Sequence, residues 1–247
     1  MRYFIDISYK GTNYRGWQRQ PNAVSVQEVF EERLFSLLKA EPMLWGCGRT
    51  DAMVHASQFI IHFDFDEIPT DLTKKLNMIL PQDIVVNSIT AMHNDAHAQF
   101  DATERTYDYY FHTQKNAYIA DISSYYNEPA LNIEAMQQAC KELINYSDFR
   151  AFCKTPDKHN HTICNVFDAK LTDKGNGNYQ FTITANRFLR GMIRIIMYNL
   201  IEIGKGRLSV EQFSELIEGK TPPKFLKMAY PQGLFLSSIK YPYFNSK

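Results

Sequence analysis

One short segment of this chain, Gly46 to Phe59 with the sequence GCGRTDAMVHASQF, places a basic and an acidic side chain where they could do chemistry. Arg49 and Asp51 stand two residues apart, directly after two glycines. Because glycine permits backbone conformations that other residues avoid, the spacing predicts a tight feature at the end of a strand. A rigid scaffold often presents its reactive groups at such a boundary. The alternative is a polar turn with a local ion pair between the two side chains.

A row of arginines is the second candidate for chemistry. A helix is predicted from about Phe188 to Ile203, and at roughly 100° per residue it places Arg187, Arg190 and Arg194 on one face. Such a row suits contacts to phosphate or to a carboxylate, although an ordinary helix with a solvated basic face has the same pattern. Two further basic segments without acids contain Lys10, Arg15 and Arg19, and Lys220, Lys224 and Lys227.

Two cysteines and two histidines between residues 153 and 164 raise the question of a metal site. Their spacing, C-x5-H-x-H-x2-C, lacks the usual pairing of ligands across a short turn, so a polar loop is favoured and no metal is expected. The chain has no P-loop, dinucleotide fingerprint or nucleophile elbow, which argues against a nucleotide cofactor and Ser-His-Asp catalysis. The four side chains are Cys153, His159, His161 and Cys164.

Composition is that of an ordinary folded protein, with 45% hydrophobic and 22% charged residues. Its 27 basic residues balance its 27 acidic residues, which argues against a nonspecific nucleic-acid binder but leaves room for local basic patches. The four cysteines form no CxxC pair, and the first residues lack the apolar core of a signal peptide. A cytoplasmic protein that does not enter a membrane is expected.

The elements that must position these residues repeat the order strand, helix, strand, strand, helix, strand. This pattern predicts the fold class α+β, with two ferredoxin-like (RRM-like) α/β subdomains whose mainly antiparallel sheets flank a central cleft. The expected division is residues 1–100, which carry Asp51, and residues 101–247. The first half is assigned to Tyr3–Tyr9, Ser25–Ala40, Leu44–Gly48, Gln58–Phe65, Thr70–Leu80 and Ile84–Met92. The second is assigned to Thr103–Thr113, Ile133–Asn145, Asn165–Thr172, Tyr179–Ala185, Phe188–Ile203 with Val210–Glu218, and Leu234–Tyr241.

Five motifs, in order along nearly the whole chain, resemble those of the tRNA pseudouridine synthase I family (TruA-type synthases). The opening YKGTNYRGWQRQ, followed by SVQEVFEERL, is similar to the first motif of that family, and GRTDAMVHA is similar to its catalytic motif, usually GRTDAGVHA. The other three are AHAQFDATERTYDYY, ANRFLRGMIRIIM and QGLFLSSIKY. A single short motif is a weak signal, whereas five in the order of the family are specific.

The resemblance implies the pseudouridine synthase fold and an isomerase, an intramolecular transferase, that converts uridine to pseudouridine in the anticodon arm of tRNA. The expected substrate positions are nucleotides 38–40, bound by a homodimer with no cofactor. Asp51 corresponds to the catalytic carboxylate, Tyr107 to the tyrosine that stacks on the target base, and Arg194 to the basic partner of Asp51. Arg49 would occupy the space of the flipped base, and Leu234 would line the uracil pocket. The remaining expected RNA contacts are Arg19, Arg187 and Arg190.

Three departures from the family pattern bear on these expectations. Met53 stands where the family usually has glycine, so a differently shaped catalytic loop is expected, because a non-glycine residue resists positive φ. Gly191 replaces a usual histidine, and Ile195 replaces the asparagine after the helix arginine. The residues with direct chemical roles are retained, which puts substrate preference more in question than activity.

Several alternatives remain open from the sequence. A pseudouridine synthase could act on another RNA or at another position, and a noncatalytic RNA-binding protein could keep the fold. Retention of Asp51, Tyr107 and Arg194 together argues against the noncatalytic alternative, because binding alone needs no such carboxylate. The third alternative is an acid–base hydrolase that uses Asp51 with His55 or His97.

Overall fold

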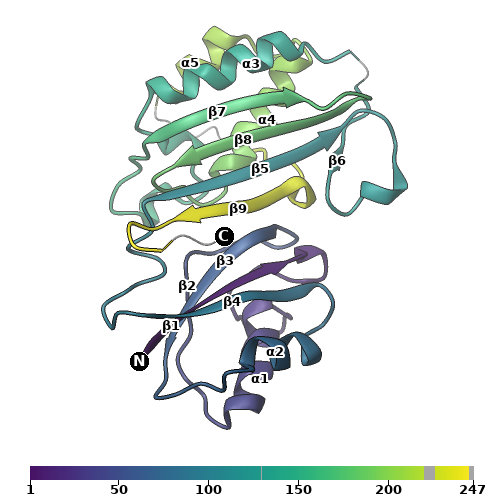
Figure 1. Ribbon diagram of the computed structural model, residues 1–247. Helices are drawn as coiled ribbons and strands as arrows, with labels where there is room; N and C mark the ends of the chain where they lie inside the picture. Colours follow the sequence, from purple (N-terminus) through teal and green to yellow (C-terminus); the bar gives the residue numbers. More distant parts are fainter. Residues whose placement is uncertain (129, 220–225, 245–247) are drawn as a thin grey trace. The chain divides into compact units, whose positions relative to one another are not determined.

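The computed structural model describes residues 1–128, 130–219 and 226–244 (Figure 1). Two of the basic residues noted in the sequence, Lys220 and Lys224, lie outside the described residues. The chain forms two compact units, one made of residues 1–103 and 235–247 and the other of residues 104–234. In the part of the chain that the structure describes, no helix is long and apolar enough to cross a membrane.

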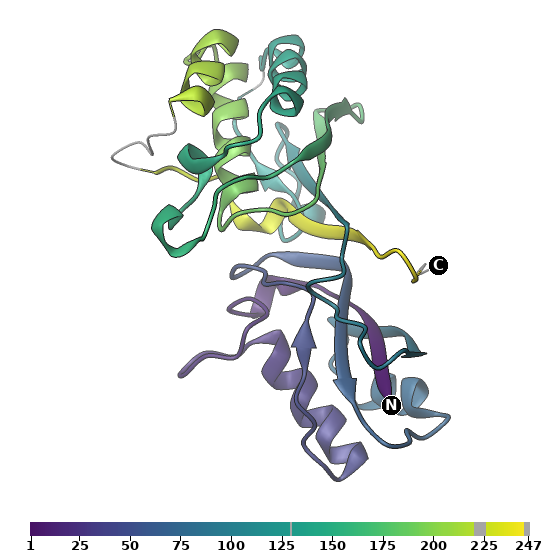
Figure 2. The same ribbon diagram turned by 90° about the vertical axis from the view of Figure 1, so that its left-hand side faces the viewer.

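The first unit follows the predicted strand and helix order, with a sheet in which β1 lies between β3 and β4 and is antiparallel to both. Its helices α1 and α2 pack against each other, and Figure 2 shows α1 running alongside the strands. The elements are β1 (Arg2–Tyr9), α1 (Val26–Leu38), β2 (Trp45–Gly46), β3 (His55–Asp64), α2 (Leu72–Ile79) and β4 (Ile84–Met92).

Local sequence explains why these elements begin where they do. The predicted cap of α1 is confirmed, because the Ser25 hydroxyl accepts a hydrogen bond from the backbone N–H of Glu28 at 3.2 Å. Consecutive side chains of β1, among them Phe4 and Ile5, are fully buried, so both faces of this strand are covered, and Phe30 of α1 is fully buried as well. This core fixes the sheet that carries the Asp51 loop.

The last strand, β9 (Leu234–Lys240), differs from the expected division of the chain. Its residues Phe235 and Leu236 pair in parallel with His55 and Ala56 of β3, so residues from 235 onward are part of the first unit rather than the second. The short β2 pairs with the other end of the same edge of β3. A strand that returns over such a long sequence separation leaves no local signal of which sheet it joins.

The second unit contains an antiparallel sheet in the order β5, β8, β7, with the short β6 parallel to the end of β5. Helix α3 packs on α4, α5 and β7, and Figure 2 shows the three helices gathered together. The elements are β5 (Glu104–His112), β6 (Ser124–Tyr125), α3 (Ile133–Glu142), β7 (Val166–Asp173), β8 (Asn178–Ala185), α4 (Met192–Gly204) and α5 (Val210–Glu218).

The predicted start of the basic helix is wrong. Helix α4 begins at Met192, because Gly191 before it has φ of 76°, a left-handed conformation that cannot continue an α-helix toward its N-terminus. Arg187 and Arg190 therefore precede the helix, and of the three predicted arginines Arg194 alone is helical. The predicted row of three arginines on one helical face does not exist.

Candidate active site

Asp51 opens a four-residue turn between β2 and β3. The backbone N–H of Val54 donates to the carbonyl of Asp51 at 3.2 Å, and Met53, the third residue of the turn, has φ of 65° while Ala52 does not have positive φ. This is type II geometry, in which the third residue is usually glycine. Met53 therefore adopts the left-handed backbone rather than avoiding it, and the departure expected at this position appears as local strain.

A segment that precedes the turn in the sequence, Tyr9 to Trp17, is here called the strap, and its backbone is hydrogen-bonded to the turn. The N–H of Met53 donates to the carbonyl of Tyr14 at 3.1 Å, and the N–H of Trp17 donates to the carbonyl of Thr50 at 3.3 Å. Glycine is needed at two points of the strap: a Cβ on Gly11 would lie 2.0 Å from the Val54 oxygen, and one on Gly16 would lie 2.3 Å from the Thr50 oxygen. The sequence reading missed this role, although two glycines among polar and aromatic residues can indicate close approach of another backbone.

Asp83, in the connection before β4, anchors the strap in turn. Its carboxylate accepts a hydrogen bond from the Tyr14 hydroxyl at 2.6 Å, and its carbonyl accepts one from the N–H of Lys10 at 2.9 Å. Burial and this carboxylate raise the pKa of Tyr14 well above its usual value, so the phenol remains a donor. The strap is thus fixed at both its side chains and its backbone.

Of the two glycines before Asp51, Gly46 is required by packing, whereas a Cβ on Gly48 would meet no atom within 4 Å. Neither Gly46 nor Gly48 uses the left-handed region. A Cβ on Gly46 would lie 2.8 Å from the Trp17 indole nitrogen and 2.9 Å from the Phe59 ring, and these two rings pack with centroids 4.2 Å apart. The tight feature predicted from these glycines is therefore located one turn later, at Met53.

His55 and His97, the histidines that the hydrolase alternative pairs with Asp51, each accept hydrogen bonds from backbone N–H groups. His55 is fully buried, its Nδ1 accepts a hydrogen bond from the N–H of Gly11 at 3.0 Å, and its ring stacks on Phe235 at 4.4 Å. The Nδ1 of His97 accepts from the N–H groups of Gln99 and Phe100 at 3.1 and 3.2 Å. Desolvation lowers the pKa of His97, which favours its neutral form.

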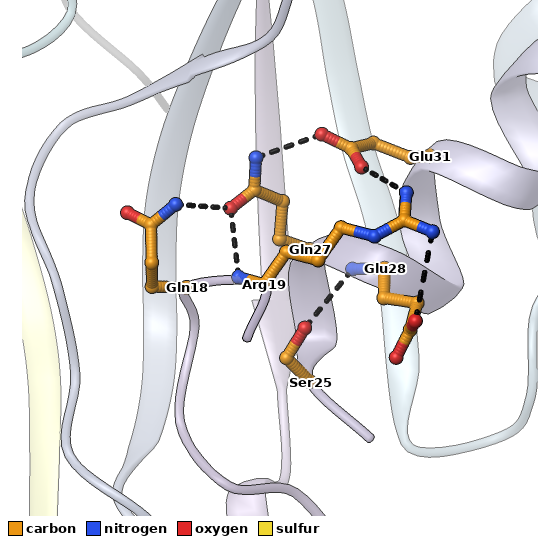
Figure 3. Close-up of polar contacts among 6 residues, drawn as sticks. All are labelled: Gln18, Arg19, Ser25, Gln27, Glu28 and Glu31. Carbon is orange, nitrogen blue, oxygen red and sulfur yellow. Dashed lines mark hydrogen bonds and ion pairs between the residues drawn. The ribbon is translucent and has the colours of Figure 1, made fainter. Parts of the chain in front are cut away.

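The two predicted RNA contacts of the first unit differ in their surroundings. Arg49 is exposed on the loop directly before Thr50 and Asp51. The Arg19 guanidinium instead lies against α1, 3.2 Å from Glu31 and 3.6 Å from Glu28 (Figure 3). Two carboxylates already face the Arg19 charge, so a phosphate would have to compete with them.

A buried amide holds the backbone next to Arg19. The side-chain oxygen of Gln27 accepts hydrogen bonds from the N–H of Arg19 and the side-chain amide of Gln18, both at 3.0 Å, and its amide donates to Glu31 at 2.7 Å (Figure 3). Gln27 is 9% exposed, and the network joins the end of the strap to the first turns of α1. Sequence reasoning had assigned Gln27 no role.

Tyr107 lies on β5 in the second unit, opposite Ile183 of β8. Its ring is half-buried and meets the edge of Phe188, with centroids 5.1 Å apart and planes at 82°. An edge-to-face pair of this kind fixes ring orientation. Phe188, which was predicted to begin the basic helix, instead supports the tyrosine from the segment before α4.

Arg194 is held by the segment that precedes β9. Its Nε donates to the carbonyl of Ala229 at 2.8 Å, and the N–H of Ala229 donates to the carbonyl of Arg194 at 2.8 Å. The next carbonyl, of Tyr230, accepts a hydrogen bond from the buried Tyr109 hydroxyl at 2.9 Å. Leu234, at the start of β9, is 6% exposed. These contacts orient the guanidinium of Arg194 within its own unit.

The other two predicted arginines lie before α4. Arg187 has its guanidinium 3.1 Å from Nε2 of His161, and Arg190 is exposed. Cys153 and Cys164 nearby are buried thiols whose pKa is raised by burial, in the case of Cys164 to about 11. Across the described ranges, no group of three or more His, Cys, Asp or Glu side chains could hold a metal ion.

The predicted site residues are thus distributed over the two units. Asp51, Arg49 and Arg19 belong to the first unit, whereas Tyr107 and Arg194 belong to the second together with Arg187, Arg190 and Leu234. Within the first unit the strap and the Asp51 turn form one connected structure. The pairing of Arg194 with Asp51 stays a prediction.

The first unit has the strand order predicted for a ferredoxin-like α/β unit, and Asp51 lies in the turn between its β2 and β3. A family model described as tRNA pseudouridine synthase matches residues 139–242. The chain is 42% identical over 244 residues to the tRNA pseudouridine synthase A of Bacteroides fragilis, a match that covers 98% of this chain and 96% of that protein. It is 43% identical to the protein of the same name from Parabacteroides distasonis, again over 98% and 96% of the two chains. The chain belongs to the tRNA pseudouridine synthase family.

Proposed function

We propose that this protein isomerises uridine to pseudouridine in the anticodon stem-loop of tRNA, at nucleotides 38–40, without a cofactor. The observation that carries the proposal is the Asp51 turn, a half-buried carboxylate on a loop fixed by the strap, in a chain that belongs to the tRNA pseudouridine synthase family. A tRNA substrate implies a cytoplasmic reaction, and the resemblance implies a homodimer.

The reaction breaks the N1–C1′ bond of uridine, turns the freed uracil and forms a C5–C1′ bond. C5 loses a proton and N1 gains one, so atoms and electrons balance with no external reagent. In this proposal Asp51 supplies the carboxylate that acts on the flipped nucleotide, and Tyr107 stacks on the base. Arg194 pairs with Asp51 to keep it ionised and oriented. Arg49 contacts the space that the base vacates, and Leu234 lines the uracil pocket.

The test is to incubate the purified protein with unmodified tRNA transcripts that carry uridine at 38, 39 or 40, and to map pseudouridine at each nucleotide. Asp51→Asn should abolish turnover while tRNA still binds, because an amide is neither nucleophile nor base. Asp66→Asn, which neutralises an exposed carboxylate in the same unit, is the matched control and should turn over normally. Binding without any pseudouridine in the parent would instead indicate a noncatalytic RNA-binding protein.

Arg194 gives a second test of the same proposal. Removing the partner of a buried or half-buried ionised group typically costs about 3–5 kcal/mol, so Arg194→Ala should lower the single-turnover rate by two orders of magnitude or more. Arg194→Lys keeps the charge but loses the Nε donor to Ala229, and should fall between the parent and the alanine variant. Equal single-turnover rates for parent and Arg194→Ala at saturating tRNA would remove Arg194 from the mechanism.

A further inference from the structure

A buried hydrogen bond links the end of β1 to the residue before Asp51. The hydroxyl of Tyr9 lies 2.8 Å from Oγ1 of Thr50, and the two residues are 4% and 8% exposed. The ring of Tyr9 also packs on Phe59, with centroids 5.7 Å apart. A rigid aromatic side chain anchored in the core therefore determines where the Thr50 hydroxyl lies.

The backbone of Thr50 is held as firmly as its side chain. Its carbonyl accepts the N–H of Trp17 at 3.3 Å, and the Cα of Gly16 packs so closely that a Cβ there would lie 2.3 Å from the same oxygen. Gly16 has φ of 88°, which favours glycine for a second reason. Since Thr50 is fixed at both side chain and carbonyl, the peptide from which Asp51 extends has little freedom.

We propose that Tyr9 is a positioning residue for the reaction, acting through Thr50 on Asp51; this rests on the function proposed above for Asp51. Catalysis is sensitive to the placement of a reacting group, and an error of about 1 Å can lower the rate about 100-fold. The Tyr9 and Thr50 hydroxyls are buried against each other, so neither is available to an RNA phosphate. Loss of the bond should therefore lower kcat and leave the affinity for tRNA unchanged.

The experiment compares Tyr9→Phe, Thr50→Val and the double variant with the parent, by single-turnover rate, tRNA dissociation constant and melting temperature. Thr50→Ser, which retains the hydroxyl, tests rescue. The matched control is Tyr241→Phe in the same unit: Tyr241 is 5% exposed, and its hydroxyl donates to the carbonyl of Ala98 at 2.6 Å. This control removes an equally buried, hydrogen-bonded hydroxyl group from a residue that is remote in sequence from the strap and the turn.

We expect Tyr9→Phe and Thr50→Val each to lower the single-turnover rate about tenfold or more, and the double variant to be no slower than the worse single variant, because both remove the same bond. Thr50→Ser should recover most of the rate, and tRNA affinity should stay within about twofold of the parent. The inference is overturned if Tyr9→Phe is no slower than Tyr241→Phe, or if its effect lies in tRNA affinity. A parent protein that makes no pseudouridine would overturn the proposed function, and this inference with it.

Discussion

At the scale of single residues, Met53 replaces the glycine that the family usually has at this position, and yet its backbone has the positive φ of 65° that glycine would adopt most easily. A non-glycine residue in the left-handed region costs roughly 1–2 kcal/mol of conformational free energy in the folded protein. Glycine avoids this cost but loses more conformational entropy on folding, which costs roughly 0.5–1 kcal/mol. Met53 as a residue is 36% exposed. The balance favours glycine.

We therefore expect Met53→Gly to raise the free energy of unfolding by about 0.5–1 kcal/mol, measured by urea denaturation. Met43→Gly is the control, because Met43 is 71% exposed and has no positive φ, and it should lower stability by up to about 1 kcal/mol. Equal changes in the two variants would show that the left-handed turn is not strained. The turnover of Met53→Gly then reports whether the strain contributes to activity.

At the scale of secondary-structure elements, features encoded by neighbouring residues were predictable. The cap at Ser25 starts α1, β4 runs from Ile84 to Met92 as predicted, and the glycine-rich turn joins β7 to β8. The predicted start of α4 was wrong because the apolar periodicity continues through Gly191, whereas the positive φ of Gly191 ends the helix there. The periodicity of apolar residues predicts which side chains share a helical face, but it does not predict the backbone φ of a glycine within the segment.

The support of the candidate site was not predictable for a different reason. Motif resemblance predicts Asp51, Tyr107 and Arg194 as site residues, but the contacts that fix Asp51 join positions far apart in sequence. Gly16 meets Thr50 across more than thirty residues, and Gln27 acts through buried hydrogen bonds that leave no periodic trace. Such long-range backbone contacts become visible once the strands are paired.

Strand β3 carries a buried histidine whose protonation should make stability depend on pH. His62 is 2% exposed, and its Nδ1 accepts a hydrogen bond from the N–H of Ala98 at 3.2 Å. Burial, together with the nearby charges of His97 and Arg2, lowers the pKa of His62 to about 4. Asp64 and Asp101 oppose this shift but do not reverse it.

The direction in which the free energy of unfolding changes with pH follows from the difference in proton binding between the folded and the unfolded chain. Well above pH 6.5 the imidazole is neutral in both the folded and the unfolded chain, whereas between pH 6.5 and about 4 the unfolded imidazole is mostly protonated and the folded one mostly is not. The free energy of unfolding should therefore fall as pH drops through this window, by about 3 kcal/mol in total from His62. The lowered pKa of His97 acts in the same direction.

His62→Asn removes the titrating group while its amide oxygen can still accept from Ala98. We expect urea denaturation between pH 8 and 4 to show a shallower loss of stability in this variant than in the parent. As the pH approaches 8 the difference in stability between the two proteins should become constant, because His62 is then neutral in both the folded and the unfolded parent. Parallel curves over the whole range would show that folding does not change the pKa of His62.

At the scale of the whole molecule, a net charge of zero must be reconciled with a polyanionic substrate. Among the described residues, Arg187 and Arg190 have no ion pair with a carboxylate, whereas Arg19 faces both Glu28 and Glu31. The charges of Arg187 and Arg190 therefore face a phosphate without competition from a carboxylate, and the contact of Arg187 is with His161. We expect the affinity for tRNA to come from such local groups rather than from the overall charge.

The corresponding prediction concerns the salt dependence of tRNA binding. Each phosphate contact releases condensed counterions, so the logarithm of affinity should fall with the logarithm of salt concentration at about 0.7 per contact for single strands. Replacing Arg187 and Arg190 together by Gln should weaken binding to all tRNAs alike and flatten this slope by more than one. Replacing Arg19 alone should flatten it less, because Glu28 and Glu31 already neutralise much of its charge.

The matched control replaces Lys74 and Lys75 of α2 by Gln, which removes the same charge from an acid-rich segment where Lys75 pairs with Asp71 at 3.0 Å. Filter binding across a salt series should give this variant the slope of the parent. If the lysine variant instead flattened the slope as much as the arginine variant, affinity would follow net charge. An unchanged slope in the arginine variant would place the RNA on another surface, because a phosphate contact cannot be removed without also removing the counterion release that accompanies it.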